Sequence, residues 1–172
     1  EEDYMKYREM AGEKISVLGF GCMRFPTTSK NAEDIDAEKS AKMLVYAIEN
    51  GVNYFDTAYV YHGGKSESFI GGVLKPYRDK IHIATKCPIW EVKCEEDFDR
   101  LLNEQLERLQ TDYIDFYLMH ALDKDRFKNV VEKFNLIDKL NKAKADGKIR
   151  HIGFSFHDDV ETLKKIIDAN PN

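Results

Sequence analysis

Short apolar segments alternate with amphipathic stretches along most of the chain. Segments rich in β-branched and aromatic residues predict strands over residues 15–21, 52–55, 81–85, 113–119 and 148–155. Apolar residues spaced three and four apart predict helices over residues 37–50, 66–74, 95–110, 127–145 and 160–169. Strand and helix therefore alternate, with a period of roughly 30 residues.

Glycines and small polar residues mark the ends of the predicted helices. Asn50-Gly51 is typical of a helix C-terminus, and Gly147 follows the end of another helix. Ser66 is predicted to cap the helix that it begins, and Asp158 or Asp159 to start the last helix. Residues 5–16 predict a small hairpin, of the kind that plugs the N-terminal end of a barrel.

Strand–helix alternation at this period is typical of right-handed βαβ units, which build a parallel sheet. About five such units in 172 residues fit either a small doubly wound sheet or part of a parallel (β/α)8 TIM barrel, which typically has about 250 residues. We interpret residues 1–172 as a single α/β domain. The positions of its polar residues favour the incomplete barrel over the doubly wound sheet.

Four polar residues lie at or just past the ends of predicted strands: Asp56, Tyr61, Lys86 and His120. The C-terminal ends of parallel barrel strands all point to one face, which carries the active site in such folds. These residues are therefore expected to converge in one pocket. A carboxylate, a phenol, an amine and an imidazole together are suited to acid–base chemistry.

Composition narrows the class of protein. The net charge is −5 and no basic stripe stands out, which argues against nucleic-acid binding. No apolar run approaches the roughly 18 residues of a membrane span, and the first residues do not predict a signal peptide. The three cysteines are widely spaced, which predicts reduced thiols, a cytoplasmic location and no metal site.

Several segments, taken in order, resemble the aldo-keto reductase family. The second-strand segment, GVNYFDTAYVY at residues 51–61, is the most specific. The other matching segments are residues 18–24, 66–71, 84–86, 106–120 and 147–155. Each is weak alone, but their order and spacing together carry the resemblance. It implies a (β/α)8 barrel that reduces small-molecule aldehydes or ketones with a nicotinamide cofactor, NADP(H) more than NAD(H).

Each strand-end residue then has a chemical role. A phenol is a weak acid at neutral pH, and a nearby ammonium stabilises its conjugate base. We therefore predict Tyr61 as the general acid, Lys86 as its charge partner, and Asp56 as the carboxylate that orients Lys86. His120 would donate to the carbonyl oxygen and orient the substrate.

Further residues are candidates for contacts with cofactor or substrate. The cofactor candidates are Gly21, Cys22, Met23, Asp56, Ser155, Phe156 and His157. Family members usually carry Asn after the fifth-strand serine, where this chain has Phe and His, so we expect His157 or a backbone group to replace that contact. The substrate candidates are Arg24, His62, Trp90 and His120.

Two other functions remain open. Lys86 could form a Schiff base, as in an aldolase, although a neighbouring Asp56 opposes the free amine that this needs. The fold could also serve as a redox-sensing or scaffolding module without catalysis. A five-strand open barrel would leave apolar edges around residues 15–20 and 149–154, which predicts self-association.

Overall fold

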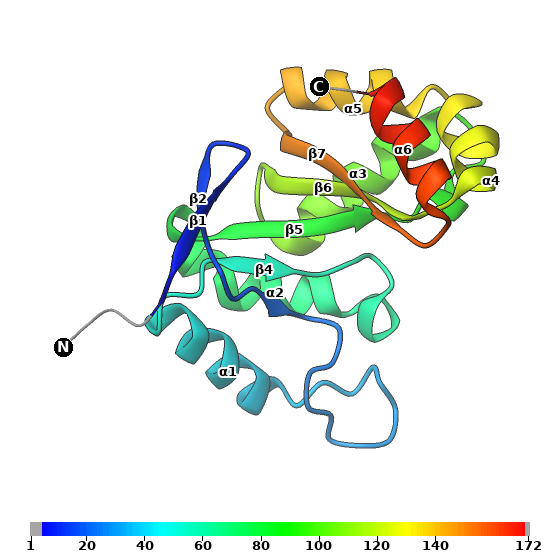
Figure 1. Ribbon diagram of the computed structural model, residues 1–172. Coiled ribbons are helices and arrows are strands. Elements are labelled where there is room, and N and C mark those ends of the chain that lie inside the picture. Colours follow the sequence, from blue (N-terminus) through cyan, green and yellow to red (C-terminus); the bar gives the residue numbers. More distant parts are fainter. Residues whose placement is uncertain (1–4, 171–172) are drawn as a thin grey trace.

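The computed structural model describes residues 5–170, which form a two-stranded sheet and a five-stranded sheet with helices (Figure 1). Strands β1 (Tyr7–Met10) and β2 (Glu13–Ser16) pair antiparallel as the expected hairpin. The larger sheet is parallel, in the order β3-β4-β5-β6-β7. Its strands are β3 (Phe20–Gly21), β4 (Tyr54–Asp56), β5 (His82–Cys87), β6 (Ile114–Leu122) and β7 (Ile149–Phe156).

Helices follow the strands in the predicted alternation. They are α1 (Ala37–Glu49), α2 (Ser66–Leu74), α3 (Glu96–Leu109), α4 (Lys124–Arg126), α5 (Leu136–Ala145) and α6 (Val160–Ala169). Short turns of helix cover Tyr61–Gly64, Lys75–Lys80, Ile89–Glu91 and Phe127–Glu132. The α/β class and the partial parallel barrel are thus confirmed. Within the described residues, none of these helices is long and apolar enough to cross a membrane.

The two faces of the sheet have different partners, because side chains alternate along each strand. Phe55, Ile83, Tyr117 and Met119 belong to the main buried core, which the helices share. Residues whose side chains point to the opposite face, such as Ala84 and Phe116, form a smaller cluster with Ile15 of the hairpin. The hairpin therefore covers part of the inner face, near the beginnings of the strands.

Three local predictions were wrong. The strand expected over 15–21 is divided between two sheets, because the Ser16 N–H donates to Asn53 Oδ1 (2.8 Å) and the hairpin ends there. The helix expected over 127–145 is interrupted at Asn135, whose φ of 52° is left-handed. Ser66 does not cap α2: its Oγ is buried and donates to the Cys22 carbonyl. Asp159 does cap α6, through the Thr162 N–H (2.7 Å).

Candidate active site

Lys86 lies at the centre of the polar residues that the strand ends bring together. Its side chain is almost fully buried, and Nζ donates to Asp56 Oδ1 and to the Thr57 carbonyl, both at 2.7 Å. Nζ also lies 3.3 Å from the Tyr61 hydroxyl. Because β4 and β5 are parallel neighbours with Asp56 level with Ala84, their C-terminal ends place these groups together.

Tyr61 begins the turn Tyr61–Gly64 that leads from β4 towards α2. Lys86 Nζ lies 4.9 Å from the centroid of its ring, so the ammonium contacts both the ring and the hydroxyl of the phenol. The Tyr61 and His120 rings meet edge to face, with centroids 6.1 Å apart and an interplanar angle of 83°. The four predicted residues Asp56, Tyr61, Lys86 and His120 form one group, which we call the strand-end group.

A β-bulge places His120. Met119 pairs with Phe154 and Leu122 with Phe156, so two residues of β6 oppose Ser155 alone. Ala121 has a left-handed φ of 52°, and its N–H donates to Ser155 Oγ at 2.7 Å. Bulges are known to re-aim side chains beside active sites. The strand was expected to stop at Met119, but it continues through the bulge to Leu122.

His120 is neutral at pH 7. Desolvation, together with the positive charge of Lys86, lowers the pKa of His120 to about 4. Among the described residues, its buried Nδ1 has no hydrogen-bond partner. A buried N–H without an acceptor is costly, so the single proton belongs on Nε2, where it can be donated.

An indole and a guanidinium line the same side of the group. Trp90, in the turn Ile89–Glu91, has its ring centroid 5.1 Å from that of His120. The Arg126 guanidinium lies 5.8 Å from the Trp90 ring and adds to the positive charge near His120. Sequence analysis missed Arg126, although Asp123, which caps the turn through the Arg126 N–H, was a recognisable helix start.

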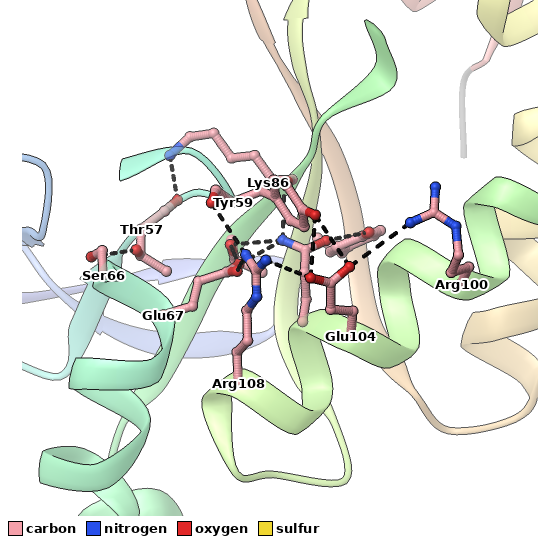
Figure 2. Close-up of polar contacts among 11 residues, drawn as sticks. Thr57, Tyr59, Ser66, Glu67, Lys86, Arg100, Glu104 and Arg108 are labelled. Atoms are coloured by element: carbon pink, nitrogen blue, oxygen red, sulfur yellow. Dashed lines mark hydrogen bonds and ion pairs between the residues drawn. The ribbon is translucent and has the colours of Figure 1, made fainter. Parts of the chain in front are cut away.

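A second polar cluster lies on the other face of β5, between the sheet and helices α2 and α3 (Figure 2). We call it the buried network; its members are Glu67, Thr85, Gln105, Arg108 and Tyr117. Glu67 Oε1 accepts from Thr85 Oγ1 and Gln105 Nε2, both at 2.6 Å, and Arg108 Nη1 lies 3.3 Å from Oε2. Burial nevertheless raises the pKa of Glu67.

The buried network holds the backbone of the strand that carries Lys86. Gln105 Nε2 donates to the Lys86 carbonyl at 3.1 Å, and Gln105 Oε1 accepts from the Tyr117 hydroxyl at 2.7 Å. Sequence analysis missed this cluster. Its signal was the polar Gln105 within the otherwise apolar inward stripe of α3.

The cofactor candidates of the first strand differ in exposure. Gly21 is exposed, and a Cβ built on it would meet nothing within 4 Å. Cys22 is fully buried; burial and the Asp56 charge hold the pKa of its thiol well above the usual range. The Cys22 N–H donates to the Asp56 carbonyl at 2.8 Å, so its backbone joins β3 to β4. Met23 is 52% exposed beside them.

The cofactor candidates of β7 lie beside the bulge. Ser155 Oγ accepts from the Ala121 N–H, which leaves the hydroxyl proton free to donate. Phe156 packs edge to face on Phe154, with centroids 6.1 Å apart. The His157 N–H donates to the Leu122 carbonyl at 3.1 Å, and the His157 charge contributes to the lowered pKa of His120.

Two substrate candidates lie on the loop side of Tyr61. Arg24 is exposed. His62, which was expected at the substrate mouth, is 7% exposed, and both nitrogens of its ring bond to the loop between β3 and α1. In the part of the chain that the structure describes, no group of three or more acidic, histidine or cysteine side chains could hold a metal ion.

Comparison with known proteins identifies the family. The model of the aldo/keto reductase family matches residues 17–171, so the chain belongs to this family. A probable aldo-keto reductase from Glycine max is 32% identical over 84% of this chain, and L-galactose dehydrogenase from Arabidopsis thaliana is also 32% identical. The chain covers 42% and 46% of these relatives, so it spans about half the length of the curated relatives it matches.

Solved structures agree with this assignment. An aldo-keto reductase from Bacillus halodurans in its holo form superposes with a TM-score of 0.78 and 30% identity, over 96% of this chain and 54% of the other. An aldo-keto reductase from Klebsiella pneumoniae in complex with NADPH gives a TM-score of 0.72 and 26% identity, over 90% of this chain and 50% of the other.

Proposed function

We propose that the strand-end group reduces aldehydes or ketones of small molecules to alcohols with NADPH as the hydride donor. The observation that carries the proposal is the position of the Tyr61 hydroxyl, 3.3 Å from Lys86 Nζ, with the His120 ring against the same phenol. Reduction of a carbonyl needs a proton on oxygen as well as hydride on carbon. A phenol beside an ammonium is suited to supply that proton.

In this mechanism Tyr61 donates its hydroxyl proton to the carbonyl oxygen, and Lys86 stabilises the phenolate that forms. Asp56 accepts from Lys86 Nζ at 2.7 Å and so fixes the direction of the ammonium. Neutral His120 donates from Nε2 to the same carbonyl oxygen and orients it, because charge develops there during reduction. Trp90 forms an apolar wall for the substrate.

The residues at the strand ends fit the nicotinamide part of the cofactor. Gly21 presents backbone without steric obstruction, and the Ser155 hydroxyl retains a proton for a carboxamide oxygen. We propose that Gly21, Cys22, Met23 and Asp56 on one side and Ser155, Phe156 and His157 on the other hold this group. Bound there, it supplies the hydride, and the protein supplies orientation and charge. The NADPH complex of the Klebsiella pneumoniae relative supports NADP(H) over NAD(H).

The alternatives are weaker. In the aldolase hypothesis Lys86 needs a free lone pair, yet Nζ donates to two oxygen acceptors, which is the role of an ammonium. A scaffolding role would not require Tyr61, Lys86 and His120 to meet. Borohydride trapping of a carbonyl substrate on Lys86 would favour the aldolase, and partner binding that survives Tyr61→Phe, with no turnover, would favour the scaffold.

The test compares Tyr61→Phe with Tyr59→Phe in this chain. NADPH binding is measured by nicotinamide fluorescence, and NADPH oxidation is followed with a panel of aldehydes and ketones. Loss of the acid should lower kcat by about 10²–10⁴-fold with NADPH affinity unchanged. Tyr59 donates to Glu104 and not to the strand-end group, so Tyr59→Phe should retain turnover. Equal turnover in the wild type and Tyr61→Phe, or none in the wild type, contradicts the proposal.

The open edges support a second proposal, self-association of the chain. Within the described residues β3 and β7 each pair on one side only, and Val17 and Leu18 beside β3 are 60% and 61% exposed. Unpaired edges with apolar neighbours favour pairing with another chain. Light scattering should give a mass above 20.0 kDa that falls in Leu18→Lys; a monodisperse monomer contradicts the proposal.

A further inference from the structure

The turn that carries Tyr61 has an unusual backbone. His62, Gly63 and Gly64 have φ values of 54°, 62° and 89°, so three consecutive residues are left-handed. Glycine adopts this conformation freely, but a residue with a Cβ does so at a cost of about 1–2 kcal/mol. The turn therefore needs contacts from outside itself to hold His62 in place.

Those contacts come from the loop that joins β3 to α1. The Phe25 N–H donates to His62 Nε2 at 3.0 Å, and His62 Nδ1 lies 2.5 Å from the Ala32 carbonyl oxygen. A backbone N–H can only donate and a carbonyl can only accept. The imidazole is therefore neutral, with its proton on Nδ1 and its lone pair on Nε2.

The rest of the loop reinforces this attachment. Phe25 is 5% exposed and lies 5.5 Å from the His62 ring and 5.2 Å from Phe69, between ring centroids. Glu33 packs so closely on Gly63 that a Cβ there would lie 2.4 Å from Glu33 Cγ, and Glu33 also pairs with Lys65 at 3.3 Å. The loop thus contacts the Tyr61 turn at several points, and two of these contacts are the hydrogen bonds of the His62 ring to Phe25 and Ala32.

We infer that His62 is a positioning residue: as a neutral, Nδ1-protonated imidazole it clamps the loop after β3 to the turn after β4 and thereby fixes the Tyr61 phenol against Lys86. The inference rests on the proposed function, since it concerns the proton donor of that reaction. His62 follows Tyr61 directly in the chain, so a change in its φ and ψ moves the Tyr61 backbone. An error of about 1 Å at a reacting group can cost about 10²-fold in rate.

Three substitutions separate the two ring hydrogen bonds. His62→Phe keeps an aromatic ring and removes both bonds. His62→Asn places an amide N–H near the Nδ1 position, so it can still donate to Ala32, and Asn tolerates the left-handed region. His62→Gln places an amide oxygen near the Nε2 position, so it can still accept from Phe25. The control is His82→Phe, which removes an imidazole at the start of β5, away from the Tyr61 turn.

Two readouts do not depend on turnover. Nitrogen-15 NMR of the chain at pH 8 should show a protonated Nδ1 and an unprotonated Nε2 for His62. Exchange of the Phe25 amide proton should be slow in the wild type and in His62→Gln, and at least tenfold faster in His62→Phe and His62→Asn. A protonated Nε2, or a Phe25 amide that exchanges equally in all variants, overturns the inference.

Kinetics then tests positioning against mere stability. His62→Phe should lower kcat roughly 10–100-fold with the KM for NADPH within about twofold, and Asn and Gln should each restore part of kcat. His82→Phe should retain kcat even where its stability falls by the same amount. A loss of kcat that only follows the folded fraction overturns the inference. Retained turnover in Tyr61→Phe would instead contradict the proposed function and leave the two NMR results to decide the clamp itself.

Discussion

The strand-end group and the buried network lie on opposite faces of the same strand and differ in how completely their polar atoms are paired. Thr85 and Lys86 are neighbours in β5, and their side chains point to opposite sides of the sheet. Glu67, Thr85 and Gln105 in the network all have hydrogen-bond partners within the protein. In the strand-end group, His120 Nδ1 has none among the described residues.

This difference indicates that the buried network supports the fold, whereas the strand-end group is available for chemistry. A buried polar cluster whose members are all satisfied makes a stable, rigid part of the core. A group that keeps the Nε2 proton of His120 and the Tyr61 hydroxyl available can instead bind and protonate a ligand. The Lys86 carbonyl belongs to the buried network, because it accepts from Gln105. The Lys86 side chain belongs to the strand-end group, because it donates to Asp56. The contrast predicts that substitutions in the two clusters affect different measurements.

The largest effect is expected for Lys86→Met on turnover. The methionine fills similar volume but removes the ammonium beside the Tyr61 hydroxyl, so kcat/KM for carbonyl reduction should fall about 10²–10⁴-fold. The free energy of unfolding should fall by only about 1–3 kcal/mol, because the buried Thr57 carbonyl loses a donor but the released Asp56 side chain is 33% exposed and water can reach it. NADPH oxidation and urea unfolding of the same sample measure both quantities.

Lys142→Met is the matched control for that substitution. Its side chain is 71% exposed on α5 and pairs with Asp146 one turn later. Both measurements should match the wild type. A large loss of stability in Lys86→Met with proportional loss of turnover would place Lys86 with the buried network instead.

The next largest effect is expected for Glu67→Leu on stability. Glu67→Leu takes the acceptor from the buried Thr85 hydroxyl and Gln105 amide, whereas Arg108 keeps its ion pair with Glu104, so the free energy of unfolding should fall by about 2–4 kcal/mol. Glu67→Gln keeps an oxygen acceptor and should cost only about 1–2 kcal/mol. Urea unfolding followed by the fluorescence of Trp90, the single tryptophan, measures both; equal costs would argue against the network.

A smaller effect is expected in the pH dependence of stability. The pKa of His120 is about 4 in the folded chain and near 6.5 unfolded, so between these values the unfolded chain binds more protons. The contribution of His120 to the free energy of unfolding is therefore complete above pH 6.5 and is lost as the pH falls towards 4. From pH 7 to pH 5 the wild type should lose about 1 kcal/mol more than His120→Gln, allowing for solvent screening. Urea unfolding at each pH measures this difference. An equal change in the free energy of unfolding with pH in the wild type and His120→Gln would contradict the lowered pKa.

The smallest effect is expected at the rim of the buried network. Glu104 pairs with Arg108 of the network (Figure 2). Arg100, whose side chain is 56% exposed, lies 3.9 Å from Glu104 and pairs with Asp97 at 2.8 Å. Exposed ion pairs contribute little, because water and salt screen them. Arg100→Ala should leave the urea midpoint unchanged within error. A clear shift would extend the network to the surface.

The amino-acid sequence determined the order of elements and the residues of the strand-end group, because both follow from local patterns. The spacing of apolar residues and the signals at helix ends predict Asp56, Lys86 and His120 at the ends of successive strands. Because these strands are parallel, their C-terminal ends bring the three residues to one face. The family is confirmed by the comparisons.

Only the tertiary structure decided how those residues are aimed and held. The bulge at His120 and Ala121 depends on Ser155, which is 34 residues beyond Ala121, and Gln105 joins Glu67 across 38 residues. His62 was predicted at the substrate mouth because it follows Tyr61, but its nitrogens bond to Phe25 and Ala32, 37 and 30 residues earlier. Such contacts leave no periodic pattern in the sequence, because they depend on the pairing of segments that only folding brings together.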